Sequence, residues 1–133
     1  MTTPSDRYLV DTHALVWFLL EDRKLPARAL RLLRAAERGE RDIIVPTIVL
    51  AEGITIEEKG RLGLPKGRIL DWVLTHPSLV VADFDLSALV EMQGLAAGLE
   101  LHDRIIAATA RLYSAAVITR DPMITRVVET MWE

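Results

Sequence analysis

Four acidic side chains are the first candidates for chemistry, and they lie 41, 51 and 18 residues apart along the chain: Asp11, Glu52, Asp103 and Asp121. Asp11 ends one short apolar run, Asp121 lies just past another, and Asp103 opens a strongly helical stretch. Carboxylates that converge in a fold repel one another unless a cation lies between them. Mg²⁺ and Mn²⁺ are hard cations that take oxygen ligands, so the pattern points to a divalent metal site that activates water.

Each carboxylate also has an ordinary structural explanation. The three aspartates stand where a side chain caps a helix N-terminus, and for each of them a cap is the alternative interpretation. Glu52 is harder to explain in this way, because helical spacing places it beside Ile48 and Ile56 on a face that should be buried. Burying a lone carboxylate is costly or forces it to take up a proton.

The elements that position these acids alternate between strands and helices. We expect strands over 7–11, 42–46, Leu79–Ala82, Ala116–Thr119 and, with the weakest signal, Val127–Trp132. We expect helices over 13–21, 26–39, 48–61 with Thr47 as its cap, 66–75, 86–97 and 103–113.

This alternation predicts an α/β fold with a parallel sheet covered by helices on both faces. The strands are short and apolar throughout, as buried parallel strands are. Ligands of such sheets bind beyond the carboxyl ends of the strands, where the strand order switches. Asp11 and Asp121 follow two of these ends, so the acids are expected at the ligand-binding edge.

Composition limits the remaining possibilities. The chain has 133 residues, of which 50% are hydrophobic, and we expect one domain over 1–133. The absence of cysteine excludes disulfides, thiolate nucleophiles and cysteine-zinc sites and favours a cytoplasmic protein. No apolar run reaches the roughly 18 residues of a membrane span, and the N-terminus lacks the features of a signal peptide.

The charge is unevenly distributed. Residues 23–41 hold seven Arg or Lys against two Glu, so this segment is +5 within a chain of net charge −3. Arg28, Arg31, Arg34 and Arg38 recur at steps of three and four residues and would line one helix face. That face either is solvated or contacts phosphate or a protein partner.

The sequence resembles the PIN domain, and specifically the VapC-type ribonuclease toxins of toxin–antitoxin pairs. "YLVDTHALVWFL" resembles the opening strand of the family with its first acid, Asp11. "VPTIVLAEGITIEEKGRLGL" resembles the segment with Glu52, although Glu57 and Glu58 stand where other members are more basic. "LELHDRIIAATARLYSAAVITRDPMI" resembles the segment with Asp103 and Asp121.

The resemblance implies a five-stranded parallel sheet between helices and a Mg²⁺- or Mn²⁺-dependent endoribonuclease. Asp11, Glu52, Asp103 and Asp121 are the expected ligands, and Thr119 would hydrogen-bond a carboxylate or a water beside them. His13 and His102 neighbour two of the acids and are expected to make structural hydrogen bonds. Either arginine next to an acid, Arg104 or Arg120, is a candidate for contact with substrate phosphate; Trp17, Trp72 and Trp132 are expected in the core or an interface.

The resemblance also implies partners. These are RNA and a VapB-like antitoxin, and we further expect a homodimer. Helices 13–21 and 48–61 carry more apolar residues than are needed to cover one face of the sheet. Part of this surface is expected to form a groove for the antitoxin, from the residues Leu15, Val16, Phe18, Leu19, Leu50 and Ile54.

Three other functions remain possible on the sequence. A housekeeping metal-dependent nuclease would use the same four acids. A metal-dependent phosphatase also starts with an aspartate after its first strand, but His13 stands where its second aspartate belongs. A domain that only binds RNA or a partner would have no need of a buried, unpaired Glu52.

Overall fold

The computed structural model describes residues 6–95 and 98–133. In these residues it contains a five-stranded sheet of β1 (Tyr8–Val10), β2 (Ile43–Pro46), β3 (Leu79–Ala82), β4 (Ala116–Ile118) and β5 (Thr130–Met131). The helices are α1 (Thr12–Leu19), α2 (Ala27–Glu37), α3 (Thr47–Lys59), α4 (Arg68–Thr75), α5 (Leu86–Gln93), α6 (Leu101–Leu112) and α7 (Pro122–Thr125).

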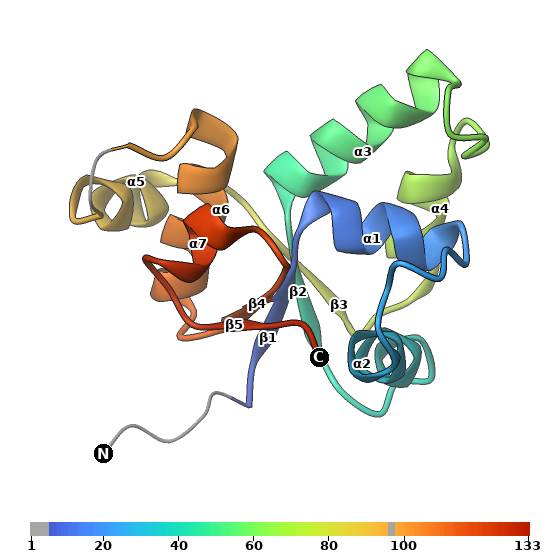
Figure 1. Ribbon diagram of the computed structural model, residues 1–133, viewed down its shortest axis with the longest axis horizontal. Helices are drawn as coiled ribbons and strands as arrows, with labels where there is room; N and C mark the ends of the chain where they lie inside the picture. Colours follow the sequence, from blue (N-terminus) through green and yellow to red (C-terminus); the bar gives the residue numbers. More distant parts are fainter. Residues whose placement is uncertain (1–5, 96–97) are drawn as a thin grey trace.

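All neighbouring strands are parallel, in the order β3-β2-β1-β4-β5. The chain moves outward from β1 to β3 and then crosses to β4 on the other side of β1. The strand order therefore switches between β1 and β4, which is where parallel sheets place their ligands. Figure 1 shows α1 to α4 on one side of the sheet and α5 to α7 on the other, which confirms the predicted α/β arrangement.

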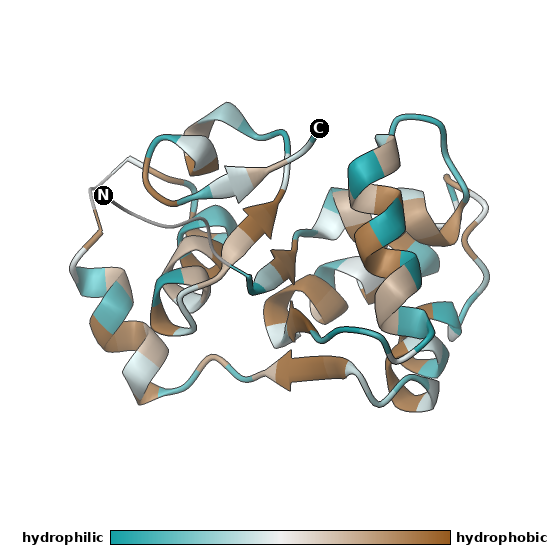
Figure 2. Ribbon diagram, turned by 90° about the horizontal axis from the view of Figure 1, so that it is seen from below, coloured by the Kyte–Doolittle hydropathy of each residue, from teal (hydrophilic) through white to brown (hydrophobic). Residues whose placement is uncertain are grey.

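The core consists of the strands and the helix faces that cover them. Leu9, Val10, Ile43, Val45 and Val117 have no exposed surface. Figure 2 shows most of the sheet as hydrophobic, whereas the helices around it alternate between hydrophilic and hydrophobic residues. The prediction that all strands are buried throughout is wrong for β3. It is an edge strand, and both of its central residues are partly exposed.

Helix α3 lies close to two neighbours, and a glycine makes this possible on one side. A Cβ atom added to Gly53 would lie 3.0 Å from the Cδ1 atom of Ile69 in α4. Glu57, one turn further, is only 6% exposed, and its carboxylate accepts hydrogen bonds from the backbone N–H groups of Gly67 and Ile69. Glu57 is therefore a structural residue, because its carboxylate accepts the free backbone N–H groups at the start of α4. It does not belong to an RNA-binding surface.

Several predicted element ends are wrong by a few residues. Thr47 does not cap α3 but is its first residue, because Pro46 ends β2 and the helix follows at once without a side-chain cap. The short helix α7 was not predicted, and β5 is shorter than the segment 127–132. The predicted helix over 86–97 ends at Gln93, and its residues 96–97 lie outside the described part of the chain.

The predicted excess of apolar surface on α1 and α3 is also wrong for most of its residues. Leu15, Val16, Phe18 and Leu50 belong to the core of the chain itself. The three arginines of α2 and Arg38 at its C-cap are exposed, as a solvated helix face requires. Within the described residues, no helix is both long enough and apolar enough to cross a membrane.

Candidate active site at the carboxyl edge of the sheet

Asp11 and Thr119 lie side by side because β1 and β4 are adjacent. Val10 is paired with Ile118, so the next residue of each strand emerges at the same place, and the Asp11 N–H donates to the Ile118 carbonyl oxygen at 3.4 Å. Thr119 is 2% exposed. Its Oγ1 atom accepts the backbone N–H of Asp121 at 3.0 Å, so Thr119 holds the turn that presents the next acid.

Asp11 is both a helix cap and a buried carboxylate. Its Oδ1 atom accepts the backbone N–H of Ala14 at 2.8 Å, which confirms the capping interpretation. The side chain is nevertheless buried, with 7% of the residue exposed. Burial raises the pKa of the Asp11 carboxyl, while hydrogen bonds from Thr119 and Ala14 and the charge of His13 oppose the shift and the charge of Asp121 adds to it. Asp11 therefore caps α1, and its buried carboxylate stays a candidate metal ligand.

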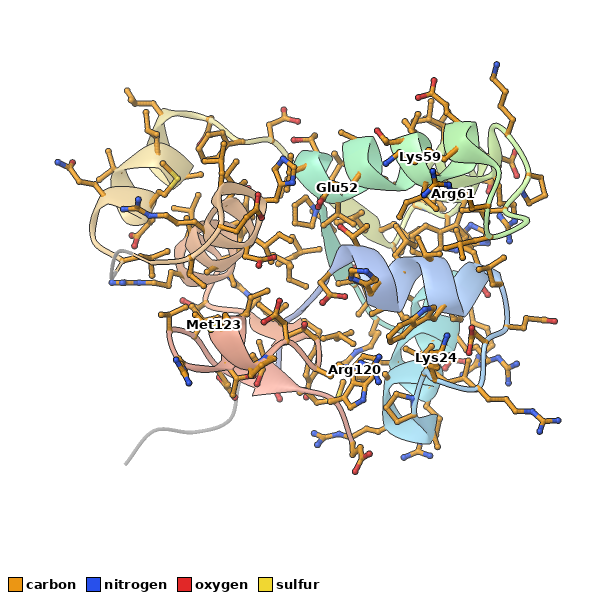
Figure 3. All side chains as sticks on the ribbon, turned by 45° about the horizontal axis from the view of Figure 1, so that its top comes forward. Lys24, Glu52, Lys59, Arg61, Arg120 and Met123 are labelled. Atoms are coloured by element: carbon orange, nitrogen blue, oxygen red, sulfur yellow. The ribbon has the colours of Figure 1, made fainter. Side chains whose placement is uncertain are left out.

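Glu52 is held by two side chains from other helices. Its Oε1 atom accepts the hydroxyl of Thr12 at 2.7 Å, and its Oε2 atom lies 3.0 Å from Nδ1 of His102. The face of α3 that is buried consists of other residues, including Val49, so the prediction of a buried face around Glu52 is wrong. The Glu52 side chain is 28% exposed and lies on the side of α3 that faces α6 (Figure 3).

Asp103 lies in the first turn of α6 and is not its cap. The cap is Glu100, whose Oε2 atom accepts the backbone N–H of His102 at 3.1 Å. Burial raises the pKa of the Asp103 carboxyl to about 6, and the negative charges of Asp121, Glu100, Glu52 and Asp11 contribute to the shift. The other three predicted acids and Glu100 are therefore near enough to Asp103 for their charges to act on it.

Asp121 caps α7 and borders the same cavity as Asp11. Its Oδ1 atom accepts the backbone N–H of Met123 at 2.8 Å, so the cap proposed as an alternative is present here too. The cavity has a volume of about 430 Å³. Its lining combines three predicted site residues, Asp11, Thr119 and Asp121, with aromatic side chains and an arginine. It is lined by Asp11, His13, Trp17, Thr119, Arg120, Asp121, Pro122 and Trp132.

The donor chemistry of the site fits a hard divalent cation. All four acids supply oxygen atoms, and the repulsion among them is of the kind that such a cation relieves. In the described residues, however, no three Asp, Glu or His side chains form a ready-made group that could hold an ion. The acids are near enough to interact through their charges, but the conformation is not that of a preformed three-ligand site.

Sequence reasoning missed one residue that orients an acid, Thr12. Thr12 directly follows Asp11, and a hydroxyl beside an acid was the available signal. His102 makes the structural contact expected of it, to Glu52. Of the two candidate arginines, Arg120 lines the cavity whereas Arg104 turns away and donates to the Met92 carbonyl oxygen at 3.0 Å.

Trp17 belongs to the core as predicted, and Trp132 packs against it, but both also line the cavity of the site. Trp17 and Trp132 border the acid-lined cavity, with ring centroids 5.9 Å apart in an edge-to-face arrangement. Trp72 lies fully buried in the core, as expected, and donates its indole N–H to Glu37 at 2.8 Å.

Known structures share this fold. VapBC2 from Rickettsia felis, solved with a DNA fragment from its promoter, is 20% identical, with a TM-score of 0.71 over 95% of this chain and 98% of that chain. DNA-bound VapBC from Salmonella typhimurium is 17% identical, with a TM-score of 0.67 over 94% and 96% of the two chains. FitAcB from Neisseria gonorrhoeae is 21% identical, with a TM-score of 0.61 over 93% and 96%.

No curated protein sequence matches the chain. The PIN domain family, in contrast, matches residues 8–129, which include every strand except the last and all four acids of the site. The sequence match, the parallel sheet and the convergence of the acids at its carboxyl edge agree with one another, and the chain belongs to the PIN domain family.

Proposed function

We propose that this PIN domain is the toxin of a VapC-type toxin–antitoxin pair and acts as a Mg²⁺- or Mn²⁺-dependent endoribonuclease. The observation that supports the proposal most directly is geometric: Asp11 and Asp121 border one cavity, and Glu52 contacts His102, the neighbour of Asp103 in α6. The four acids come from different elements, and within the described residues none of them forms an ion pair with a lysine or an arginine. The similarity in fold to VapBC and FitAcB structures supports the toxin assignment.

The proposed metal ligands are Asp11, Glu52, Asp103 and Asp121. A bound ion would supply an activated water and would neutralise the charge that develops on the phosphate. The residues around the ligands have supporting roles. Thr119 holds the turn of Asp121, while Thr12 and His102 keep the Glu52 carboxylate in one orientation.

The proposed substrate is RNA in a loop or a single strand, because proteins generally recognise RNA sequence there and not in duplexes. The test compares two capping aspartates. Asp121 and Asp85 each accept a backbone N–H at the start of a short helix, but only Asp121 borders the cavity. Asn caps as well as Asp, so Asp121→Asn and Asp85→Asn should both fold.

We expect the purified protein to cut RNA internally with Mg²⁺ or Mn²⁺ and to stop in EDTA. Asp121→Asn should abolish cleavage, and Asp85→Asn should retain it. Cleavage by Asp121→Asn at the rate of the parent, after contaminating nucleases are removed, would contradict the nuclease proposal. Binding of RNA with no cleavage by the parent under any metal would favour a non-catalytic PIN domain.

The proposed partners are a VapB-like antitoxin and a second copy of the chain. The similar structures are toxin–antitoxin complexes, which supports the first partner. Expression of this chain alone should slow bacterial growth, and co-expression of an adjacent small gene should restore it. An active enzyme without toxicity would instead indicate a housekeeping nuclease. Light scattering of the isolated chain tests the homodimer.

A further inference from the structure

Arg120 is a cation next to the acids that does not neutralise them. It borders the cavity together with Asp11 and Asp121, yet in the described part of the chain its guanidinium forms no ion pair within 4.0 Å. Its guanidinium carbon instead lies 4.6 Å from the centroid of the Trp17 ring. A cation–π contact fixes the side chain while leaving its N–H donors available to another group.

The same cavity offers an aromatic surface beside this cation. The Trp132 side chain is partly exposed and packs edge-to-face with Trp17, and the His13 ring centroid lies 5.8 Å from that of Trp17. Trp17 itself is 9% exposed, so it serves as the support on which the other groups rest. The cavity thus has acids on one side and an arginine with an aromatic ring on the other.

The size and chemistry of the cavity suit one nucleotide. Its volume of about 430 Å³ falls within the range of roughly 300–1,000 Å³ found for small-ligand sites. An arginine donates hydrogen bonds to phosphate oxygens, and a partly exposed indole can stack on any of the four bases. The two features lie next to the carboxylates that would act on the neighbouring phosphodiester.

We propose that this cavity is the subsite for a nucleotide flanking the scissile phosphate, with Arg120 contacting a backbone phosphate, Trp132 contacting the base and Trp17 positioning Arg120. The inference rests on the proposed ribonuclease function, since it names how the RNA is held. It extends that function because it assigns the substrate contacts to residues outside the four acids.

Lys24 provides a matched control. Its Nζ atom also lies over the Trp17 ring, 5.6 Å from the centroid, but Lys24 does not line the cavity and pairs with Asp22 at 3.7 Å. Figure 3 shows both cations on this side of the molecule. Arg120→Gln and Lys24→Gln each remove one cation that lies over the Trp17 ring. An effect caused only by the loss of this contact with Trp17 would therefore appear in both variants.

The kinetic experiment measures kcat/KM on single-stranded RNA over a series of KCl concentrations. Arg120→Gln should lower kcat/KM about tenfold, mainly through KM, and should reduce the slope of log kcat/KM against log salt by about 0.7, the value for one lost phosphate contact on a single strand. Arg120→Lys should recover most of the slope, because it restores the charge. Lys24→Gln should keep the slope of the parent.

A second experiment does not require activity. The indole N–H resonances of the three tryptophans are followed by NMR while each nucleoside 5′-monophosphate is added. The Trp17 and Trp132 resonances should shift, and that of the fully buried Trp72 should not. The shifts should weaken in Arg120→Gln and remain in Lys24→Gln. Trp132→Leu should weaken binding about 5- to 100-fold, as expected when one base loses its stacking partner.

The outcomes separate this inference from the proposed function. RNA cleavage in which Arg120→Gln and Lys24→Gln have equal salt slopes would overturn the subsite and leave the nuclease intact. Absence of cleavage together with nucleotide shifts that depend on Arg120 would support nucleotide binding by Arg120 and Trp132 and overturn the nuclease. If no nucleotide moves the Trp17 and Trp132 resonances, the subsite is overturned whatever the activity.

Discussion

Asp11 allows the electrostatic and capping roles of one side chain to be separated by two substitutions. Asn keeps the hydrogen bond from the Ala14 N–H but carries no charge, whereas Ala has neither. The difference in melting temperature between Asp11→Asn and Asp11→Ala therefore measures the cap. The difference between Asp11→Asn and the parent measures the buried charge.

The expected size follows from the length of the chain. Its 133 residues correspond to an unfolding entropy of about 0.28 kcal/mol/K, so 1 kcal/mol changes the melting temperature by about 3.5 °C. A lost cap costs about 1 kcal/mol, and Asp11→Asn should melt about 3.5 °C above Asp11→Ala. An ion at ten times its dissociation constant adds about 1.4 kcal/mol, which should raise the melting temperature of the parent by about 5 °C.

The sign of the charge effect follows from the pKa of Asp11, which burial raises above its usual value of 3.8. Between that value and the raised one the folded state binds more protons than the unfolded state, so the free energy of unfolding falls as pH rises through this window. In EDTA at neutral pH, Asp11→Asn should thus melt at or above the parent. The advantage should disappear as the pH approaches 3.8.

Differential scanning calorimetry of the three proteins, with EDTA and with Mn²⁺, is the assay. Asp11→Asn should also lack the metal-induced rise and all RNase activity. A parent that melts above Asp11→Asn in EDTA at neutral pH would show that the carboxylate charge stabilises the metal-free fold. Equal responses of both proteins to metal would remove Asp11 from the proposed ligands.

Three further predictions concern other residues. The pKa of Asp103, about 6 in the folded protein against its usual 3.8, predicts that protons compete with the ion: Mn²⁺ affinity measured by calorimetry should fall by up to about tenfold per pH unit below pH 6 and level off above it. Thr12→Val removes the 2.7 Å hydrogen bond to Glu52 and should lower kcat/KM on RNA by about 10- to 100-fold with little change in melting temperature; an unchanged kcat/KM would contradict its role. Glu57→Ala leaves the N–H groups of Gly67 and Ile69 without their acceptor and should cost about 2–4 kcal/mol in urea unfolding, while the activity of the folded fraction stays that of the parent.

The fold class and the positions of the acids were predictable because they depend on local patterns. Short apolar runs that alternate with helical periodicity predict a parallel sheet, and residues that follow such runs must emerge at its carboxyl edge. Asp11 and Asp121 were found in this way. Glu52 and Asp103 were found from their places in predicted helices, and the family resemblance supported all four acids together.

Only the tertiary structure decided which side chains orient the acids of the site and which acids lie outside it. Thr12 and Glu52 are 40 residues apart, and their contact exists because α1 and α3 pack together at one edge of the sheet. Glu57 is as acidic as Glu52, yet its carboxylate serves the start of α4. Sequence specifies each helix through short-range periodicity, but the partner of a polar side chain depends on which elements the strand order makes neighbours. The order β3-β2-β1-β4-β5, set by packing of the whole chain, is therefore what brings Arg120 and Trp17 to the same cavity as Asp11.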